Sequence, residues 1–322
     1  MKVLITGITG FVGSHLVDYI LANHPEVEIH GTCRWRSDVS NIKHVLGRVC
    51  LHEGDLKDAH SVYELIERIK PDKIFHLAAQ SYVPTSWNSP AETLSTNIVG
   101  QANLFEAVKK FHVSGYDPII QIAGSSEEYG QVEADELPIK ENNPLRPMSP
   151  YAVSKVGQDY MGYQYWMSYK IRIIRTRAFN HSGPRRGEVF VDSNFAKQIA
   201  EIEKGKCLPE IKVGNLDAIR DFSDVRDIVR AYWLGTEKCT PGDVYNICSG
   251  RLIKIKDLLD ALLQLSKEKN ITIRQCAERL RPSDVPVLVG DCTKFKQATG
   301  WQPEIDYQST LSDLLAFWRE RV

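Results

Sequence analysis

Residues 2–21 read KVLITGITGFVGSHLVDYIL, and this stretch decides the fold. A short apolar run at residues 3–5 leads into three glycines, after which apolar side chains recur at the spacing of one helical face. The pattern predicts a buried strand, a glycine turn and a helix whose N-terminus holds a phosphate. The spacing GxxGxxG is one residue longer than the usual dinucleotide fingerprint, and three close glycines also make an ordinary tight turn. The glycines are Gly7, Gly10 and Gly13.

Strand-like and helix-like segments alternate along the next hundred residues. Strands are expected at residues 27–32, 49–52, 73–79 and 118–123, and one of the helices between them covers roughly residues 90–111. This alternation predicts an α/β fold, a Rossmann-type doubly wound parallel sheet that binds ligands at the carboxyl ends of its strands. The character of the sequence changes near Phe179. We therefore expect a nucleotide-binding domain over residues 1–178 and a smaller α/β substrate-binding lobe over residues 179–322.

The segment after the second expected strand, CRWRSD, indicates which dinucleotide binds. An acidic side chain at this place would bind the ribose hydroxyl of NAD, but Arg34 and Arg36 stand there instead. Two arginines suit the 2′-phosphate of NADP, although arginines in a solvated loop are the alternative. Asp55, after the third expected strand, could hold the adenine or simply cap the next helix. NADP is expected, and NAD less so.

Composition excludes several classes of partner. The net charge is -1 and no Lys/Arg run stands out, which argues against a nucleic-acid partner. The 7 cysteines include no CxxC pair, so reduced thiols in a cytoplasmic protein and no metal site are expected. No stretch approaches the about 18 apolar residues of a membrane span. A few placed arginines would have to meet an anionic substrate.

Two polar groups after the fifth expected strand are candidate catalytic residues. If extended backbone persists through residues 124–130, GSSEEYG, then Ser125 and Glu127 point to one side of the chain. Ser126 and Glu128 then point to the other side. An exposed polar loop is the alternative.

The segment YAVSK favours the catalytic alternative, because Tyr151 and Lys155 share one helical face. A phenol must lose about three pKa units to act at neutral pH, which costs roughly 4 kcal/mol. One ammonium about 4 Å away at an effective dielectric near 20 supplies about that much. Together with the glycine turn and the two arginines, this pair indicates an acid/base for hydride transfer.

These segments resemble the extended short-chain dehydrogenase/reductase family that acts on nucleotide sugars, and within it the GDP-mannose 4,6-dehydratases. The resemblance runs nearly end to end through TGITGFVG, RWRS, HLAAQSYV, NIVG, SSEEYG, SPYAVSK, FNHSGPRRGEVFV, GNLDAIRDF, RPSDVPVLVGD and GWQPEI. It implies that residues 224–234 and 243–250 return to the first domain. It also implies that helices around residues 101–112 and 151–169 pair subunits in a homodimer or homotetramer.

The resemblance further implies a reaction and a role for each residue. Tyr151 would remove the O4 proton of GDP-mannose while hydride leaves C4, and Glu127 would then remove the C5 proton. Water would leave C6, hydride would return to C6, and the product would be GDP-4-keto-6-deoxymannose. For Asn180 an ordinary turn, and for Lys197 a solvated side chain, are the alternatives. The implied catalytic residues are Ser125, Glu127, Tyr151 and Lys155; the implied NADP-binding residues are Gly7, Gly10, Val12, Gly13, Arg34, Arg36, Asp55, Leu56, Leu77, Ala78, Ala79, Tyr151 and Lys155; the implied substrate-binding residues are Asn180, Lys197, Arg220 and Arg281.

Some positions depart from the dehydratase pattern. Asn194 replaces a basic residue and Pro286 replaces an aspartate. SSEEYG and NFAKQI resemble the NADPH-dependent GDP-4-keto-6-deoxymannose reductases, which share the catalytic set, whereas RWRSDVSN and RRGEVF resemble the dehydratases. A dehydratase is expected; the alternatives are the reductase, or a dehydratase or epimerase acting on another GDP-sugar such as a GDP-heptose. A protein that only senses NADP would not need Tyr151 and Lys155.

Overall fold

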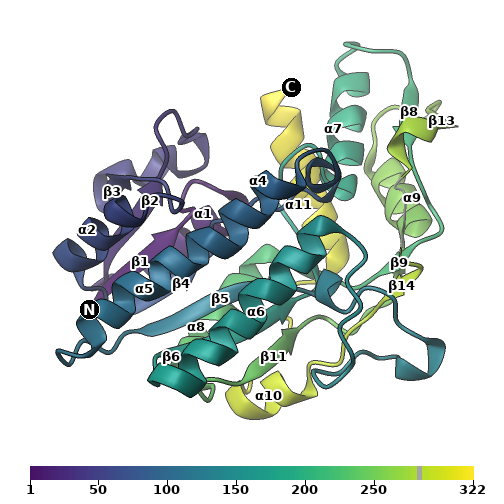
Figure 1. The fold of residues 1–322 in the computed structure, drawn as a ribbon. Helices are drawn as coiled ribbons and strands as arrows, with labels where there is room; N and C mark the ends of the chain where they lie inside the picture. Colours follow the sequence, from purple (N-terminus) through teal and green to yellow (C-terminus); the bar gives the residue numbers. More distant parts are fainter. Residues whose placement is uncertain (281–284) are drawn as a thin grey trace.

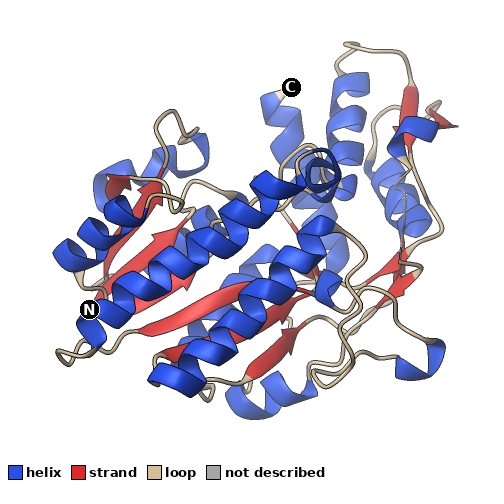
Figure 2. Cartoon of the chain, in the orientation of Figure 1, coloured by secondary structure: helices blue, strands red, loops and turns tan. Residues whose placement is uncertain are grey.

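One seven-stranded sheet carries the larger part of the chain (Figure 1, Figure 2). The computed structural model describes residues 1–280 and 285–322, and its large sheet has the order β11-β6-β5-β4-β1-β2-β3. Every neighbouring pair is parallel. The chain starts at β1, winds outward to β3, crosses to β4 and winds outward again, which confirms the predicted doubly wound fold. The strands are β1 (Lys2–Thr6), β2 (Glu28–Cys33), β3 (Cys50–Glu53), β4 (Lys73–His76), β5 (Ile119–Ser125), β6 (Arg172–Ala178) and β11 (Val244–Ile247).

Helices cover both faces of this sheet. In Figure 1, α5 and α6 cross one face with α2 beside them, and a core of α2, α5 and sheet residues lies beneath. On the other face α1 packs against α8. The helix expected near residues 90–111 forms as α4, η2 and α5 in succession. These elements are α1 (Phe11–Asn23), η1 (Ser40–Arg48), α2 (Ala59–Ile69), α3 (Val83–Asn88), α4 (Pro90–Leu94), η2 (Ser95–Val99), α5 (Gly100–His112), η3 (Ser126–Glu128), η4 (Ala134–Glu136), α6 (Pro150–Tyr169), α8 (Val225–Lys238) and α10 (Thr293–Thr299).

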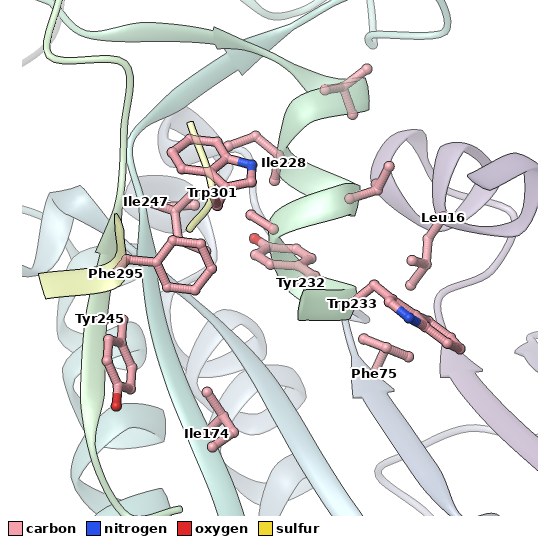
Figure 3. Close-up of a cluster of buried hydrophobic side chains, with 14 of the residues drawn as sticks. Leu16, Phe75, Ile174, Ile228, Tyr232, Trp233, Tyr245, Ile247, Phe295 and Trp301 are labelled. Atoms are coloured by element: carbon pink, nitrogen blue, oxygen red, sulfur yellow. The ribbon is translucent and has the colours of Figure 1, made fainter. Parts of the chain in front are cut away.

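Large aromatic side chains fix α8 against the sheet (Figure 3). Trp233 is 1% exposed, and its ring stacks on Phe75 of β4 with centroids 6.0 Å apart. Trp301, after α10, packs on Phe295 with centroids 5.6 Å apart and donates Nε1–H to the carbonyl of Asp227. Each fully buried side chain of this size contributes about 2–3 kcal/mol. The C-terminal segment is thereby anchored to α8 and, through it, to the large sheet.

A smaller lobe with its own core lies at one end of the large sheet, in the upper right of Figure 1. Its core joins α7, α9 and α11, and short strands run around it. Residue 179, where the division was predicted, lies between β6 and β7. Two later elements belong to the large sheet, since β11 pairs with β6 and α8 packs on β5 and β6. The remaining elements are β7 (Asn180–Ser182), α7 (Val191–Glu203), β8 (Glu210–Val213), β9 (Ile219–Arg220), β10 (Phe222–Asp224), β12 (Ile253–Lys254), α9 (Ile255–Leu265), β13 (Thr272–Gln275), η5 (Ala277–Arg279), β14 (Val287–Leu288) and α11 (Tyr307–Arg321).

Across residues 1–280 and 285–322, each helix is too short or too polar to cross a bilayer.

Candidate functional site

The glycine turn after β1 has the geometry that an anion needs. Gly7 has a φ of 71°, and Gly10 donates its N–H to the carbonyl of Gly7 at 3.0 Å. A Cβ on Gly13 would lie 2.4 Å from that carbonyl oxygen, so only glycine lets α1 pack this close. Among the described residues no side chain caps the N-terminus of α1, and its first turn, which includes Val12, holds no acidic residue. Its N–H groups are available to a phosphate.

Arg34, Arg36 and Asp55 line one surface cavity of about 420 Å³. Both arginines lie just beyond β2, and the guanidinium of Arg36 lies 4.2 Å from the ring centroid of Trp35. Two cations therefore line the same opening as two carboxylates, Glu53 and Asp55, at the carboxyl ends of β2 and β3. A second cavity of about 170 Å³ shares Asp55 with the first and adds Leu56.

The end of β4 lies against the glycine turn. A Cβ on Gly7 would lie 3.0 Å from the Cα of Ala78. The hydroxyl of Thr6 accepts from the backbone N–H groups of Leu77 and Ala78, each at 3.1 Å. Leu77, Ala78 and Ala79 thus lie at the point between β1 and β4 where the strand order reverses. In folds of this class a dinucleotide crosses the sheet at that point.

Ser125 and Glu127 lie at the end of β5, in a local structure that differs from the prediction. β5 ends with Ser125, and residues 126–128 form one 3₁₀ turn, so the expected extended backbone does not continue. Ser125 caps this turn, and its Oγ accepts from the N–H of Glu127 at 3.2 Å. The two pairs differ in burial, since Ser125 and Glu127 are half-buried whereas Ser126 and Glu128 are buried.

Helix α6 presents Tyr151 and Lys155 to the same site. Ser149 starts the helix as its N-cap, and its Oγ accepts from the N–H of Ala152 at 3.1 Å. Tyr151 is 8% exposed and hydrogen-bonds to Ser125. Lys155 is 4% exposed and donates from Nζ to the carbonyl of Ala123 on β5 at 2.8 Å. The end of β5 and the first turn of α6 therefore form one site.

The electrostatics of Tyr151 differ from the prediction. Burial raises the pKa of Tyr151, the hydrogen bond from Ser125 lowers it, and the charge of Glu127 raises it. The cation that lowers this pKa is Arg186, on the connection between β7 and α7. Lys155 Nζ lies 5.9 Å from the phenol ring centroid, and burial lowers the pKa of Lys155 to about 8. The prediction that Lys155 lowers the pKa of Tyr151 is therefore wrong. Burial of the phenol raises this pKa by more than the charge of Arg186 lowers it.

A buried ion network behind the site was missed from the sequence. Glu128 accepts from the N–H of Ser125 at 2.7 Å and from Arg177 Nε at 3.1 Å. Arg177 also pairs with Asp159, which pairs in turn with Arg175. Burial and the charge of Asp159 raise the pKa of Glu128. This network fixes the backbone of Ser125. The sequence feature that could have revealed it is the pair of consecutive acidic residues, because here one of the two, Glu128, is buried and needs partners inside the protein.

The four predicted substrate-binding residues lie in different surroundings. Asn180 begins β7 and is half-buried. Lys197 on α7 pairs with Glu188, so its charge already has a partner. Arg220 ends β9, is 6% exposed and donates from Nη1 to two backbone carbonyls. Arg281 lies outside the described residues. Their roles stay predictions.

One possible set of metal ligands lies on β2 and β3. Ligand atoms of Glu28, His30 and Cys50 are within 4.8 Å of one another. Hydrogen bonds explain the arrangement, because Arg68 donates to Nδ1 of His52 and Nε2 of His52 lies 2.9 Å from Nδ1 of His30. This order assigns the proton of His30 to Nε2, which lies 2.9 Å from the Glu28 carboxylate. The nitrogen that an ion would need is therefore protonated, and we assign no metal here.

Known proteins resemble this chain over nearly its full length. The model of the family described as GDP-mannose 4,6 dehydratase matches residues 4–314. The GDP-6-deoxy-D-mannose reductase of Pseudomonas aeruginosa is 33% identical over 321 residues, which cover 100% of this chain and 98% of the reductase. The GDP-mannose 4,6-dehydratase of Yersinia enterocolitica is 32% identical over 356 residues, covering 98% of this chain and 93% of that protein. The solved structure of RMD from Pseudomonas aeruginosa complexed with NADPH matches with a TM-score of 0.86 at 33% identity, covering 100% of this chain and 99% of that one.

Proposed function

Because the chain belongs to the GDP-mannose 4,6-dehydratase family, we propose that it converts GDP-mannose to GDP-4-keto-6-deoxymannose. The observation that carries this proposal is the meeting of Ser125, Glu127 and Tyr151 at the end of β5. Ser125 hydrogen-bonds to Tyr151, and the charge of Glu127 acts on the same phenol. A hexose placed there meets a phenol that can act as an acid/base for oxidation at C4 and a carboxylate that can remove the C5 proton.

We propose NADP as the cofactor, which supplies a hydride acceptor and donor when bound. The glycine turn would hold its pyrophosphate, and Arg34 and Arg36 would hold its 2′-phosphate. Asp55 and Leu56 would contact the adenine, and Leu77 to Ala79 would lie beside the other end of the dinucleotide. Support comes from the shared cavity of the two arginines and Asp55, and from the relative that binds NADPH.

The residues of this chain would divide the proton transfers among them. Tyr151 would take the O4 proton while Ser125 holds the same oxygen, and C4 becomes a ketone. The ketone acidifies the C5 hydrogen, and Glu127 would remove it as a general base before water leaves C6. Lys155 would orient the reactants as a cation, since a pKa of about 8 keeps it mostly protonated at neutral pH.

The proposal is tested by incubating the purified protein with GDP-mannose and catalytic NADP, without added reductant. The expected product is a 4-keto sugar nucleotide lighter by one water, detected by mass spectrometry. Glu127→Gln should block the loss of water while C4 oxidation persists slowly. Full dehydration by that variant contradicts the role of Glu127, and an inactive wild type contradicts the dehydratase.

The reductase is the second candidate, and one observation favours it. The alignment with the reductase relative spans 321 residues and covers 100% of this chain at 33% identity. The alignment with the dehydratase spans 356 residues, which is longer than this chain, and covers 98% of it. The same residues would then transfer a proton to O4 as hydride arrives at C4. Stoichiometric oxidation of NADPH by GDP-4-keto-6-deoxymannose, together with no reaction on GDP-mannose, would identify the reductase.

We also propose that α6 pairs with a second copy of the chain. Five large side chains of this helix are exposed, at 46% for Val153, 56% for Tyr160, 43% for Tyr163, 50% for Met167 and 41% for Tyr169. Apolar patches of this kind mark contact surfaces. Analytical ultracentrifugation should find a dimer or tetramer for the wild type and a smaller species for Tyr160→Glu. A monomeric wild type contradicts the pairing.

A further inference from the structure

The backbone at the end of β5 is held from two sides by buried charged groups. On one side, Nζ of Lys155 donates to the carbonyl of Ala123 at 2.8 Å. On the other side, Oε1 of Glu128 accepts from the N–H of Ser125 at 2.7 Å. Lys155 is 4% exposed and Glu128 is 0% exposed, so both contacts are shielded from water. Lys155 and Glu128 together hold residues 123–125, and we call this arrangement the strand-end clamp.

Gly124 lies at the centre of the strand-end clamp and leaves the room that it needs. A Cβ at this position would lie 2.6 Å from Oε1 of Glu128 and 2.5 Å from the carbonyl oxygen of Thr176 on β6. Both separations are shorter than those that real Cβ atoms show. Glycine at position 124 therefore lets the Glu128 carboxylate reach the backbone next to it.

A buried ion network fixes the Glu128 carboxylate itself. Its Oε2 accepts from Nε of Arg177 at 3.1 Å, and the same Nε donates to Asp159 at 2.6 Å. Arg177 lies on β6, directly opposite Gly124 in the pairing of β5 with β6. Asp159 lies on α6, the helix that carries Tyr151. The network therefore joins the strand-end clamp to the strand and the helix on either side of the reaction site.

The strand-end clamp determines where the side chain of Ser125 lies. Ser125 is the last residue of β5, and its Oγ accepts from the N–H of Glu127 at 3.2 Å and hydrogen-bonds to Tyr151. In the proposed reaction this hydroxyl and the phenol contact the same oxygen, O4 of the sugar. A shift of the Ser125 backbone would move Oγ away from O4, and a misplacement of about 1 Å can cost about a hundredfold in rate.

We propose that Glu128 is a positioning residue, which acts through the N–H of Ser125 to hold the Ser125 hydroxyl at O4 of the sugar. The reach of its carboxyl oxygen matters more than its charge, because Arg177 keeps Asp159 as a partner when that charge is lost. The inference rests on the proposed function, in which Ser125 and Tyr151 both contact O4.

Two conservative changes at Glu128 separate the reach of the side chain from its charge. Glu128→Gln keeps the length and an oxygen that accepts from Ser125, whereas Glu128→Asp keeps the carboxylate but is shorter by one bond of about 1.5 Å. With GDP-mannose, Glu128→Gln should keep kcat within about threefold of the wild type. Glu128→Asp should lower kcat about a hundredfold and change KM less than about threefold, because the nucleotide contacts are retained. Steady-state kinetics measure both constants.

Two further comparisons show whether Glu128 acts through Ser125. In Ser125→Ala no hydroxyl remains to be positioned, so adding Glu128→Asp should lower kcat less than about threefold further. Glu141 supplies the matched control, since it is a half-buried glutamate whose Oε1 accepts from the N–H of Asn246 at 2.8 Å. Glu141→Asp should keep kcat within about threefold of the wild type, because Asn246 does not contact the sugar in the proposed reaction.

Three results would overturn this inference alone and leave Glu128 with a structural role. They are a wild-type kcat for Glu128→Asp, an equal loss from this change with and without the Ser125 hydroxyl, and a Glu128→Gln variant slower than Glu128→Asp. If Glu128→Asp does not fold, Glu128→Gln decides, since a loss in kcat of more than about threefold contradicts positioning by reach.

The wild type separates this inference from the proposed function. A wild type that only reduces the 4-keto sugar with NADPH contradicts the dehydratase, and the same variants are then compared in that reaction. A wild type that acts on neither GDP-mannose nor the 4-keto sugar contradicts both the proposed function and the role of Glu128.

Discussion

The nucleotide half and the sugar half of the site are built from different parts of the chain. Around the glycine turn the backbone does the work, because Gly7 and Gly13 bring α1 close to β1 and leave its first N–H groups open. Around Tyr151 the site depends on buried side chains, and several of them, such as Lys155 and Glu128, are ionisable. The nucleotide half should therefore be stable without a bound ligand. The second half carries an energetic cost, because burial penalises the charge of Lys155.

Lys155→Met should give the largest effect and sharpens this comparison. Turnover should fall about a thousandfold, because the cation next to Tyr151 is lost. The unfolding free energy at neutral pH should nevertheless rise by about 2 kcal/mol, since burial lowers the Lys155 pKa to about 8. Steady-state kinetics and urea unfolding measure the two quantities. If Lys155→Met lowers both the turnover and the unfolding free energy, the claim that the buried charge of Lys155 destabilises the fold is contradicted.

The difference in unfolding free energy between the wild type and Lys155→Met should depend on pH, because it arises from the lowered pKa of Lys155. The pKa of Lys155 is about 8 in the protein and 10.5 ordinarily, so between these values the unfolded chain binds more protons. The stability of the wild type relative to Lys155→Met should therefore rise with pH across this window. Below pH 8 the unfolding free energy of the wild type should stay below that of Lys155→Met by the full amount. Unfolding curves for both proteins at several pH values check this sign.

Gly13→Ala should break the backbone half. The added Cβ would lie 2.4 Å from the Gly7 carbonyl oxygen and 2.9 Å from the Cα of Ile8, so the turn must shift. We expect a loss of about 2–3 kcal/mol in unfolding free energy and weaker NADP binding. Gly47→Ala is the matched control, because no atom lies within 4 Å of its added Cβ. Equal losses in the two variants would refute the close-packing explanation.

The double variant Arg34→Ala, Arg36→Ala tests the side chains that complete the nucleotide half. NADP affinity should fall about tenfold or more, because charge-assisted hydrogen bonds to the 2′-phosphate are lost. NAD affinity should change little. Arg48→Ala is the control, since Arg48 is an exposed arginine at the end of η1. Fluorescence titration with both dinucleotides measures the ratio, and an equal loss for NAD and NADP would refute the 2′-phosphate role.

The sequence predicted the backbone half better than the side-chain half, for a physical reason. Glycine spacing and strand periodicity are local, and they placed the turn and the doubly wound sheet. Whether Lys155 reaches the phenol depends on burial and on Ala123, which is 32 residues away in the chain. The partners of Glu128 likewise depend on tertiary contacts between distant elements, since Arg177 lies 49 residues away in the chain. Residue type alone could not assign them.

Lys197→Met should have the smallest effect and tests where the sugar half ends. Lys197 pairs with Glu188 at the edge of α7, and such exposed pairs contribute about 0–1 kcal/mol. We expect KM for the GDP-sugar to change less than about threefold, as such a contribution allows. If Lys197 instead binds the diphosphate, Lys197→Met should raise KM well above that limit, and Glu188→Gln, which leaves Glu201 as the remaining carboxylate partner of the ammonium, should lower it. Opposite shifts in these two variants would extend the substrate-binding surface along α7, whereas two small shifts would confine it to the residues around Tyr151.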